Sequence, residues 1–216
     1  MTTNDTERPA PTTLRRLESP AAASLARWCE IFEELQTVLR CCERLVAELA
    51  PAGVGPLVRT PDEVVLEAVW TTALLSSGRC FSPEVADGST EGGAGYGLTQ
   101  ADLDAAQPDA QTSEWHEVLM RLRDHYGDPV LDPRERFSVG LAQDDAGRAS
   151  GVAITSRRQP LVDDVTVRQT GAIAYALSTL VDARITVAQA KLFEDVKATP
   201  RSELDELEVL DVLELT

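Results

Sequence analysis

The two histidines are the side chains best suited to move a proton near neutral pH. They are His116 and His125, and both lie in the segment 115–126. Glu117 follows His116, but position 120 is Met, so the HExxH zinc pattern is not formed. The chain contains no GxSxG motif, and no histidine is placed to orient an obvious Ser or Cys nucleophile. We therefore expect no metal site and no catalytic triad.

The cysteines and the one glycine-rich segment also predict no cofactor. The cysteines follow neither a CxxC pattern nor any zinc-site spacing; they are Cys29, Cys41, Cys42 and Cys80. We expect them to be reduced thiols on helices. The segment 91–97 is glycine-rich, but no strand precedes it and no Lys-Ser/Thr pair follows it, as a phosphate-binding loop would require. It is predicted to be a connecting loop.

Arg123, Asp124 and His125 form the one cluster that could act on a phosphate. An arginine can stabilise the charge that develops on a phosphate, and a histidine can transfer the proton. An alternative interpretation is an ordinary polar helix end, because cations at a helix C-terminus complement the helix dipole. The catalytic candidates are these three residues, and the sequence leaves both interpretations open.

The segment 115–126 resembles the end of the signature helix in HEPN-type proteins (higher eukaryotes and prokaryotes nucleotide-binding). These are small α-helical domains, often dimeric, found among toxin and phage-defence RNases. The resemblance covers about residues 112–190, and Arg123 and Asp124 match the first two positions of the family motif. The histidine that should follow a few residues later is absent, since Gly127-Asp128-Pro129 stand there. The resemblance therefore implies an RNase or a catalytically degenerate relative.

Composition and charge favour a protein partner over nucleic acid or a membrane. The formal net charge is −16, which opposes binding to phosphate backbones and to anionic lipid. The longest uncharged apolar run, 169–181, is too short for a spanning helix, and the first residues do not resemble a secretory signal. We therefore expect a cytoplasmic protein without a cofactor.

Periodicity predicts a mainly α fold. Apolar residues recur at helical spacing over 19–50, 60–80, 112–126 and 164–195, with a short helix at 99–106. Thr60 and Glu63 suggest a capping box at the start of the second helix. A period of two over the stretch from about 135 to 156 predicts a β-hairpin. The fold expected is a bundle of about four helices with a small β-hairpin inserted before the last long helix.

The two ends of the chain are predicted to lie outside this bundle. Residues 1–18 have the composition of a disordered arm, and the helical domain spans 19–198. Residues 199–216 form an acidic tail with a leucine at every third position: Leu204, Leu207, Leu210 and Leu213. This tail is either a docking motif that folds on a basic, apolar groove or an unstructured solubilising segment.

Two functions remain open from the sequence. The first is a non-enzymatic interaction or assembly protein that self-associates through its long helices, with the tail or hairpin as a docking element. Its partner would be another protein or a second copy of the chain. The second is a HEPN-like RNase, or a degenerate relative, from a defence or toxin system; only this hypothesis implies a nucleic-acid partner.

Overall fold

The computed structural model describes residues 13–50, 61–81, 97–106, 110–128, 135–158 and 162–210. The fold is mainly helical with two small antiparallel strand pairs, which confirms the predicted fold class. The helices are α1 (Pro20–Leu49), α2 (Glu63–Cys80), α3 (Gln100–Ala106), α4 (Ala110–Gly127), α5 (Asp164–Val196) and α6 (Arg201–Glu206). The strands are β1 (Leu14–Arg15), β2 (Glu135–Gln143), β3 (Ala149–Arg158) and β4 (Val209–Leu210).

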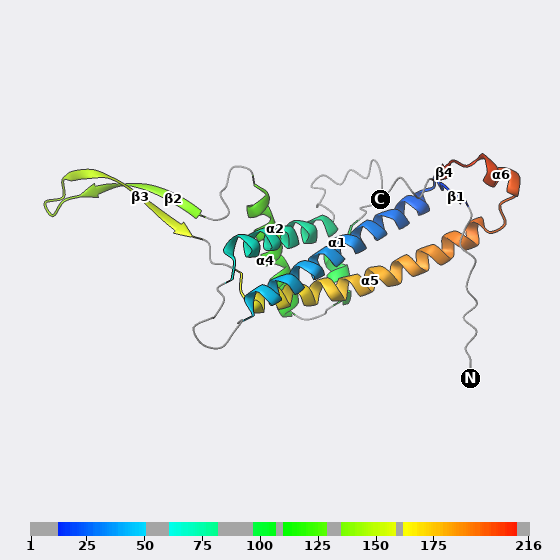
Figure 1. The fold of residues 1–216 in the computed structure, drawn as a ribbon, viewed down its shortest axis with the longest axis horizontal. Coiled ribbons are helices and arrows are strands. Elements are labelled where there is room, and N and C mark those ends of the chain that lie inside the picture. Colours follow the sequence, from blue (N-terminus) through cyan, green and yellow to red (C-terminus); the bar gives the residue numbers. More distant parts are fainter. Residues whose placement is uncertain are drawn as a thin grey trace, which may run out of the picture.

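The longest helices, α1 and α5, run antiparallel through the whole length of the bundle (Figure 1). Their buried residues alternate three and four positions apart, which is the spacing of a heptad seam. On α1 these residues are Ile31, Leu35, Val38, Cys42 and Leu45, and on α5 they are Val167, Thr170, Ala174, Leu177 and Val181. The seam narrows at Gly171, where an added Cβ would lie 3.4 Å from the Cβ of Cys42.

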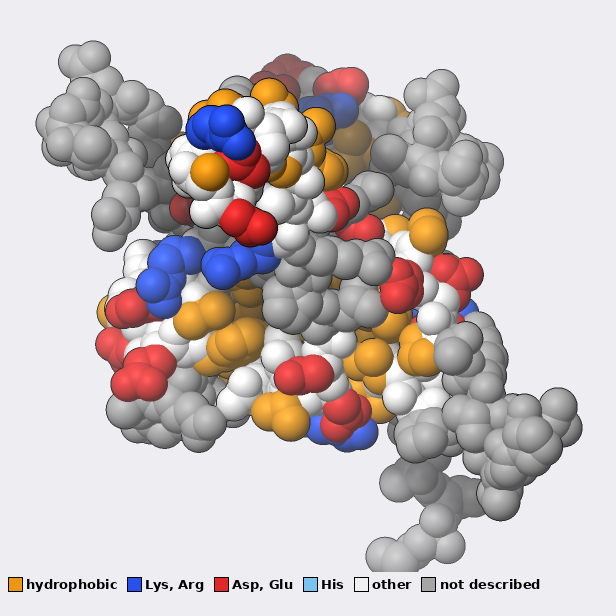
Figure 2. All heavy atoms as spheres, turned by 90° about the vertical axis from the view of Figure 1, so that its left-hand side faces the viewer, with side chains coloured by type: hydrophobic (Ala, Val, Ile, Leu, Met, Phe, Trp, Pro, Cys, Tyr) orange, Lys and Arg blue, Asp and Glu red, His pale blue; other side chains and the backbone are white. Residues whose placement is uncertain are grey.

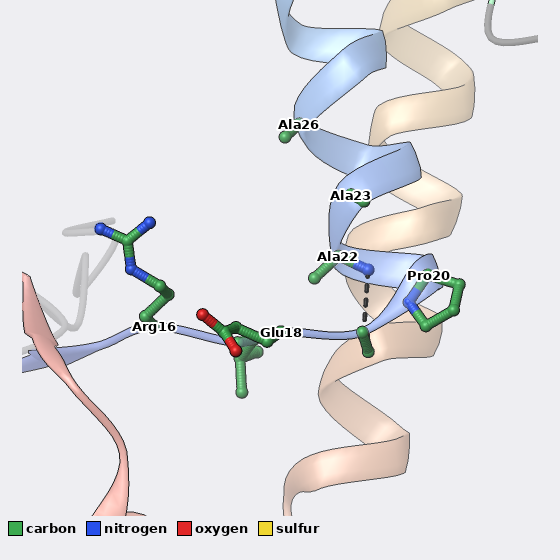
Figure 3. A pocket seen from close by; sticks show the side chains of 8 residues that line it. Arg16, Glu18, Pro20, Ala22, Ala23 and Ala26 are labelled. Carbon is green, nitrogen blue, oxygen red and sulfur yellow. Dashed lines mark hydrogen bonds between the residues drawn. The ribbon is translucent and has the colours of Figure 1, made fainter. Parts of the chain in front are cut away.

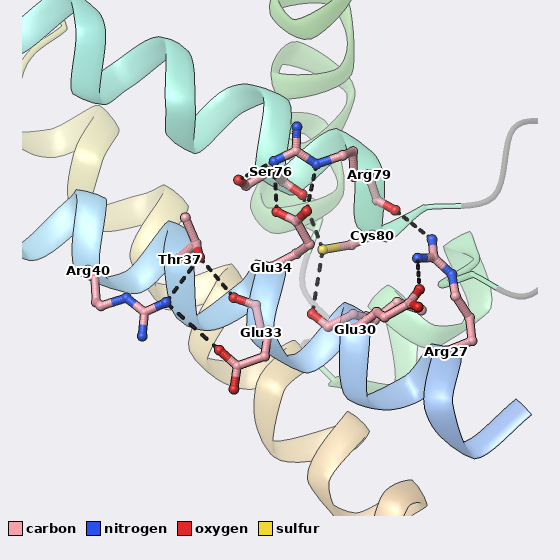
Figure 4. Close-up of polar contacts among 10 residues, drawn as sticks. Arg27, Glu30, Glu33, Glu34, Thr37, Arg40, Ser76, Arg79 and Cys80 are labelled. Carbon is pink, nitrogen blue, oxygen red and sulfur yellow. Dashed lines mark hydrogen bonds and ion pairs between the residues drawn. The ribbon is translucent and has the colours of Figure 1, made fainter. Parts of the chain in front are cut away.

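The other helices pack onto this pair. Helix α2 lies against α1, and α4 contacts both α2 and α5. A polar network holds α1 and α2 together at their surface (Figure 4). Arg79 donates from Nε to Glu34 Oε1 at 2.6 Å and from an η nitrogen to Glu34 Oε2 at 2.9 Å. This paired contact lowers the pKa of Glu34.

The short helix α3 is held to the bundle by Leu103, which is fully buried in the core, and by a polar contact from α5. Arg184 donates to the carboxylate of Asp102 on α3, and its guanidinium carbon lies 4.9 Å from the centre of the Trp28 ring on α1. Burial alone would raise the pKa of Asp102, but the bonds from Arg184 and Thr99 outweigh it and lower that pKa. Arg184 therefore joins three helices.

The N-terminal caps confirm the predicted starts of α1 and α5 and correct the predicted start of α2. Ser19 Oγ accepts from the Ala22 amide at the start of α1, and Asp163 accepts from the Thr166 amide at the start of α5. The predicted capping box at the second helix is wrong. Helix α2 begins at Glu63 and its cap is Asp62, whose carboxylate accepts from the amides of Val64 and Val65. Asp62 satisfies two free amides by itself; Thr60 lies outside the described residues.

The hairpin β2–β3 projects from one end of the bundle, and the opposite end narrows to the paired ends of α1 and α5 (Figure 1). The register pairs Val139 with Ile154 and Leu141 with Val152. The turn is closed by Asp144, whose carboxylate accepts from the amides of Ala146 and Arg148, and Gly147 has a φ of 78°. Glycine adopts that left-handed conformation without steric cost.

The two ends of the described chain meet at the narrow end. Strand β1 pairs with β4, and Arg15 donates to the carbonyl oxygens of Asp205 and Leu207 at 3.0 and 2.7 Å. A further ion pair joins Arg16 to Glu208 at 2.7 Å. The predicted disordered arm, 1–18, therefore extends too far, because Leu14–Arg15 form a strand. Sequence periodicity did not predict this clasp because a two-residue strand has no period.

We expect Arg184→Ala to lower the free energy of unfolding by about 1 kcal/mol, at the lower end for a charged hydrogen bond because the guanidinium is partly exposed. The substitution leaves the Asp102 carboxylate, only 13% exposed, without this cation. Urea unfolding is the measurement. Arg168→Ala is the control, since it removes an exposed ion pair with Asp164 from the same helix. Equal effects of the two substitutions would contradict the role given to Arg184.

Deleting residues 201–216 should change the midpoint of thermal unfolding by only about 2–4 °C, the shift that corresponds to roughly 1 kcal/mol in a chain of this size. The deletion removes α6 and a strand pair of two residues, but no residue of the bundle core. Differential scanning calorimetry is the measurement. A drop several times larger would mean that the clasp supports the bundle.

Candidate functional site

Arg123 lies against the last turns of α2. An added Cβ at Gly78 would stand 2.1 Å from Arg123 Cδ and 3.4 Å from its Nε, so the arginine stem occupies the space that the glycine leaves. Its guanidinium donates to Asp124 Oδ1 from Nε at 2.9 Å and from an η nitrogen at 2.6 Å. A cation beside a helix C-terminus is stabilised by the helix dipole. The contacts of Arg123 thus favour a structural role at the α2–α4 interface.

His116 lies two turns before Arg123 on α4 and is buried. Its side chain is 6% exposed, and its ring centre lies 4.3 Å from that of Phe81. Nδ1 has no hydrogen-bond partner among the residues that the structure describes. Burial lowers the pKa of His116, and the positive charge of Arg123 lowers it further. The neutral imidazole is therefore the favoured form, which suits a packed core histidine.

Among the described residues, no hydrogen bond or ion pair joins His125 to Arg123. The ring of His125 lies edge-on to that of Tyr126, with ring centres 6.3 Å apart. The structure therefore brings Arg123 and Asp124 into contact, and the histidine that acts electrostatically on Arg123 is the buried His116. Sequence reasoning missed the burial of His116, although its spacing from Leu119 and Arg123 places all three on one side of α4.

The thiols offer no alternative nucleophile in the core. Burial raises the pKa of Cys42 to about 12 and that of Cys80 to about 12, and burial also raises the pKa of Cys41. Only a thiolate attacks or binds metal efficiently. The described residues contain no group of three or more His, Cys, Asp or Glu side chains that could hold a metal ion.

The hairpin carries an apolar face that the bundle leaves uncovered. Five large side chains share this face and are 62–73% exposed: Phe137, Val139, Leu141, Val152 and Ile154. Seen end on, apolar side chains lie on this projecting arm and also on the end of the bundle beneath it (Figure 2). A contiguous exposed apolar surface on a soluble protein commonly marks an interaction site.

The opposite face of the hairpin is flat and ends in two cations. Its side chains over the middle of the strands are small, and the register pairs Ser138 with Thr155 and Gly140 with Ala153. At the base of the hairpin Arg136 stands directly opposite Arg157, and both are exposed. Within the described part of the chain, no carboxylate forms an ion pair with either arginine. Like charges directly across a strand pair repel.

A further apolar feature is a groove on the surface of the α1–α5 pair. Its volume is about 580 Å³. It is lined by Leu39, Cys42 and Val46 of α1 and by Val167, Ala172 and Tyr175 of α5, with Glu43 and Arg168 among its polar lining. Tyr175 is 67% exposed. This groove contains neither histidine and has the character of a docking surface.

A second groove, of about 490 Å³, follows the start of α1 (Figure 3). Arg16 and Glu18 line it from the segment that leads into the helix, and Ala22, Ala23 and Ala26 line it from the helix itself. Neither groove contains Arg123 or His116.

The leucines of the tail lie in the clasp rather than on the bundle. Leu204 belongs to α6, Leu207 caps that helix and Leu210 belongs to β4; all three are half-buried. Leu213 lies outside the described residues, as does most of the glycine-rich segment 91–97. The docking role of these leucines stays a prediction.

Among the described helices, α5 is long and apolar enough to cross a membrane, judged by length and composition alone. A core helix of a soluble protein passes the same test. The buried side of α5 packs on α1 through residues that include Val167, Leu177 and Val181. Of the apolar stretch of α5, 28% is buried in this way.

Lowering the pH from 7 to 5.5 should reduce the free energy of unfolding through His116. Its pKa in the folded chain lies below the unfolded value of about 6.5, so the unfolded chain binds more protons as the pH falls. The contribution of the neutral His116 to the free energy of unfolding is complete above the unfolded pKa and is lost progressively as the pH falls below it. We expect His116→Gln to flatten this pH dependence, measured by urea unfolding. His125→Gln, which retains His116, is the control, and an unchanged slope in His116→Gln would contradict the assignment.

Comparisons with known proteins give no relative from which a function could be transferred. No family model matches the chain, and neither a curated protein nor a solved structure matches it. The HEPN resemblance rests on Arg123 and Asp124 alone and stays a prediction.

Proposed function

We propose that this chain is a non-enzymatic assembly protein that self-associates and uses the hairpin β2–β3 as a docking arm. One observation carries the proposal: the apolar face of the arm, centred on Val139 and Ile154, is 70% exposed or more at both side chains. A two-stranded hairpin is marginally stable alone in water. An arm of this kind gains stability when a partner covers it.

The charge distribution supports the same function. The arm, residues 135–158, has four arginines and three carboxylates, a net charge of +1 in a chain of −16. The helical part is therefore strongly acidic, which favours solubility and opposes nucleic acid and anionic membranes. The partner we propose is a protein surface, including a second copy of this chain, and the compartment we propose is the cytoplasm.

Helix surfaces add a second set of exposed apolar side chains. On α5, Tyr175 is 67% exposed, Val187 70% and Phe193 56%. Such side chains on the longest helix support self-association through the helices as well as through the arm. In this proposal the acidic tail, with Leu204 and Leu207, is an additional docking element.

A HEPN-like RNase, or a catalytically degenerate relative, is the competing proposal. Its support is the electrostatic interaction of Arg123 with His116, which would pair a phosphate-stabilising cation with an imidazole. Against it stand the burial of His116 and the close fit of Arg123 on Gly78. RNA cleavage requires both side chains to reach a substrate.

The proposed function predicts an oligomer without nuclease activity. We expect sedimentation velocity to give a mass greater than that of one chain, 23.4 kDa, and incubation with RNA to leave the RNA intact. Replacing residues 135–158 by a short Gly/Ser linker should lower the mass, because it removes the exposed apolar face.

Control variants distinguish self-association from RNA cleavage. Val64→Lys changes an exposed apolar side chain of α2 that is 75% exposed and lies off the arm, and should leave the mass unchanged. RNA cleavage that disappears in Arg123→Ala would overturn the non-enzymatic proposal. A wild-type chain that stays monomeric at high concentration would overturn self-association.

A further inference from the structure

We infer that the arm of one copy docks into the α1–α5 groove of a second copy, and that the exchange is reciprocal. The inference rests on the proposed function and adds to it the identity of the partner and of the receiving surface. It depends on three features of the chain: the uncovered arm, the groove beside its root, and the opposite charges of arm and body.

The arm cannot cover its own groove. The groove is lined by the first turns of α5, from Val167 to Tyr175, and β3 ends at Arg158, only a short segment earlier. From that root the arm projects away from the bundle (Figure 1). A two-fold axis near the root would let each arm reach the other copy's groove, which gives a closed dimer rather than an open chain.

The chemistry of the two surfaces is complementary. The arm presents aliphatic side chains and one phenyl ring, and the groove presents Leu39, Val46 and the ring of Tyr175. The arm carries a net charge of +1, to which the exposed Arg136 and Arg157 of its flat face contribute. The body of the second copy attracts the arm, since the chain without the arm carries a net charge of −17.

The size of the contact suits a specific dimer only when it is made twice. Strands of nine and ten residues are each roughly 30 Å long, so one face of the arm offers about 300 Å². One arm in one groove would bury about 600 Å² over both surfaces, below the roughly 1,200 Å² of a stable interface. Two reciprocal contacts reach that value, which favours exchange over a single contact.

Insertion of the arm into a membrane is less favourable. Its tip carries Asp144 and Asp145, which would enter the lipid first, and the acidic body opposes approach to anionic lipid. Binding of the full chain to anionic vesicles that is lost with Val139→Asp/Ile154→Asp, in a chain that is monomeric without vesicles, would overturn the inference in favour of a membrane.

The test uses matched substitutions in the full chain. On the arm, Val139→Asp/Ile154→Asp places two charges on the apolar face, and Ser138→Asp/Thr155→Asp places the same charges at a neighbouring cross-strand pair of the flat face. On α5, Tyr175→Glu lies in the groove and Val187→Glu lies outside it, with similar exposures of 67% and 70%. We expect Val139→Asp/Ile154→Asp and Tyr175→Glu each to raise the dimer dissociation constant about a hundredfold. The matched variants, Ser138→Asp/Thr155→Asp and Val187→Glu, should leave it nearly unchanged.

Mixing then identifies which surfaces meet. Val139→Asp/Ile154→Asp and Tyr175→Glu should each dimerise only weakly alone. An equimolar mixture restores one intact arm in one intact groove, so its mixed dimer should be weaker than the wild-type dimer but more abundant than random pairing of the two variants gives, as measured by native mass spectrometry. A dimer that survives Tyr175→Glu, or a mixed dimer no more abundant than random pairing gives, would overturn the arm-in-groove contact and leave self-association standing. A monomeric wild-type chain would overturn both.

Discussion

The heptad seam between α1 and α5 is the interaction on which the rest of the structure depends. Aliphatic side chains from Ile31 to Leu45 on one helix meet those from Val167 to Val181 on the other, and each of these four is at most 1% exposed. Helices in antiparallel contact can bury such a stripe over several turns, and burial of apolar area is the main source of stability. The glycine at position 171 lets the two helices approach closely at Cys42.

This arrangement explains why the ends of the molecule differ. The seam, with α2 and α4 packed beside it, forms the body, and α3 is attached through Leu103 and Arg184. Beyond the body, the paired ends of α1 and α5 end in the β1–β4 clasp, whereas the connection into α5 carries the hairpin outward. The core is complete without the hairpin, so the hairpin's apolar face remains exposed. An exposed face of this kind supports the assembly role that we propose.

The sequence predicted the long elements well because the apolar residues of each have a clear period. The spacing of α1 and α5, the caps Ser19 and Asp163, and the alternation of the hairpin all follow from local chemistry. Local chemistry cannot predict contacts between residues far apart in sequence. The β1–β4 clasp, the contact of Arg123 with Gly78 and the three-helix contacts of Arg184 each join distant segments. The cap of α2 was mispredicted because Thr60 and Asp62 are both good capping residues, and sequence alone does not decide between them.

The candidate site shows the same limit. Arg123 and Asp124 were identified from residue type, but their packing against α2 depends on the missing side chain at position 78.

The central claim is that the core is complete without the hairpin, whose apolar face stays open until a partner covers it. The most direct test of this claim is hydrogen–deuterium exchange at several protein concentrations. We predict that amides of the α1–α5 seam are protected at every concentration, and that amides of residues 135–158 become protected only as the concentration rises. Hairpin amides that exchange at one unchanging rate across the whole range would contradict this account.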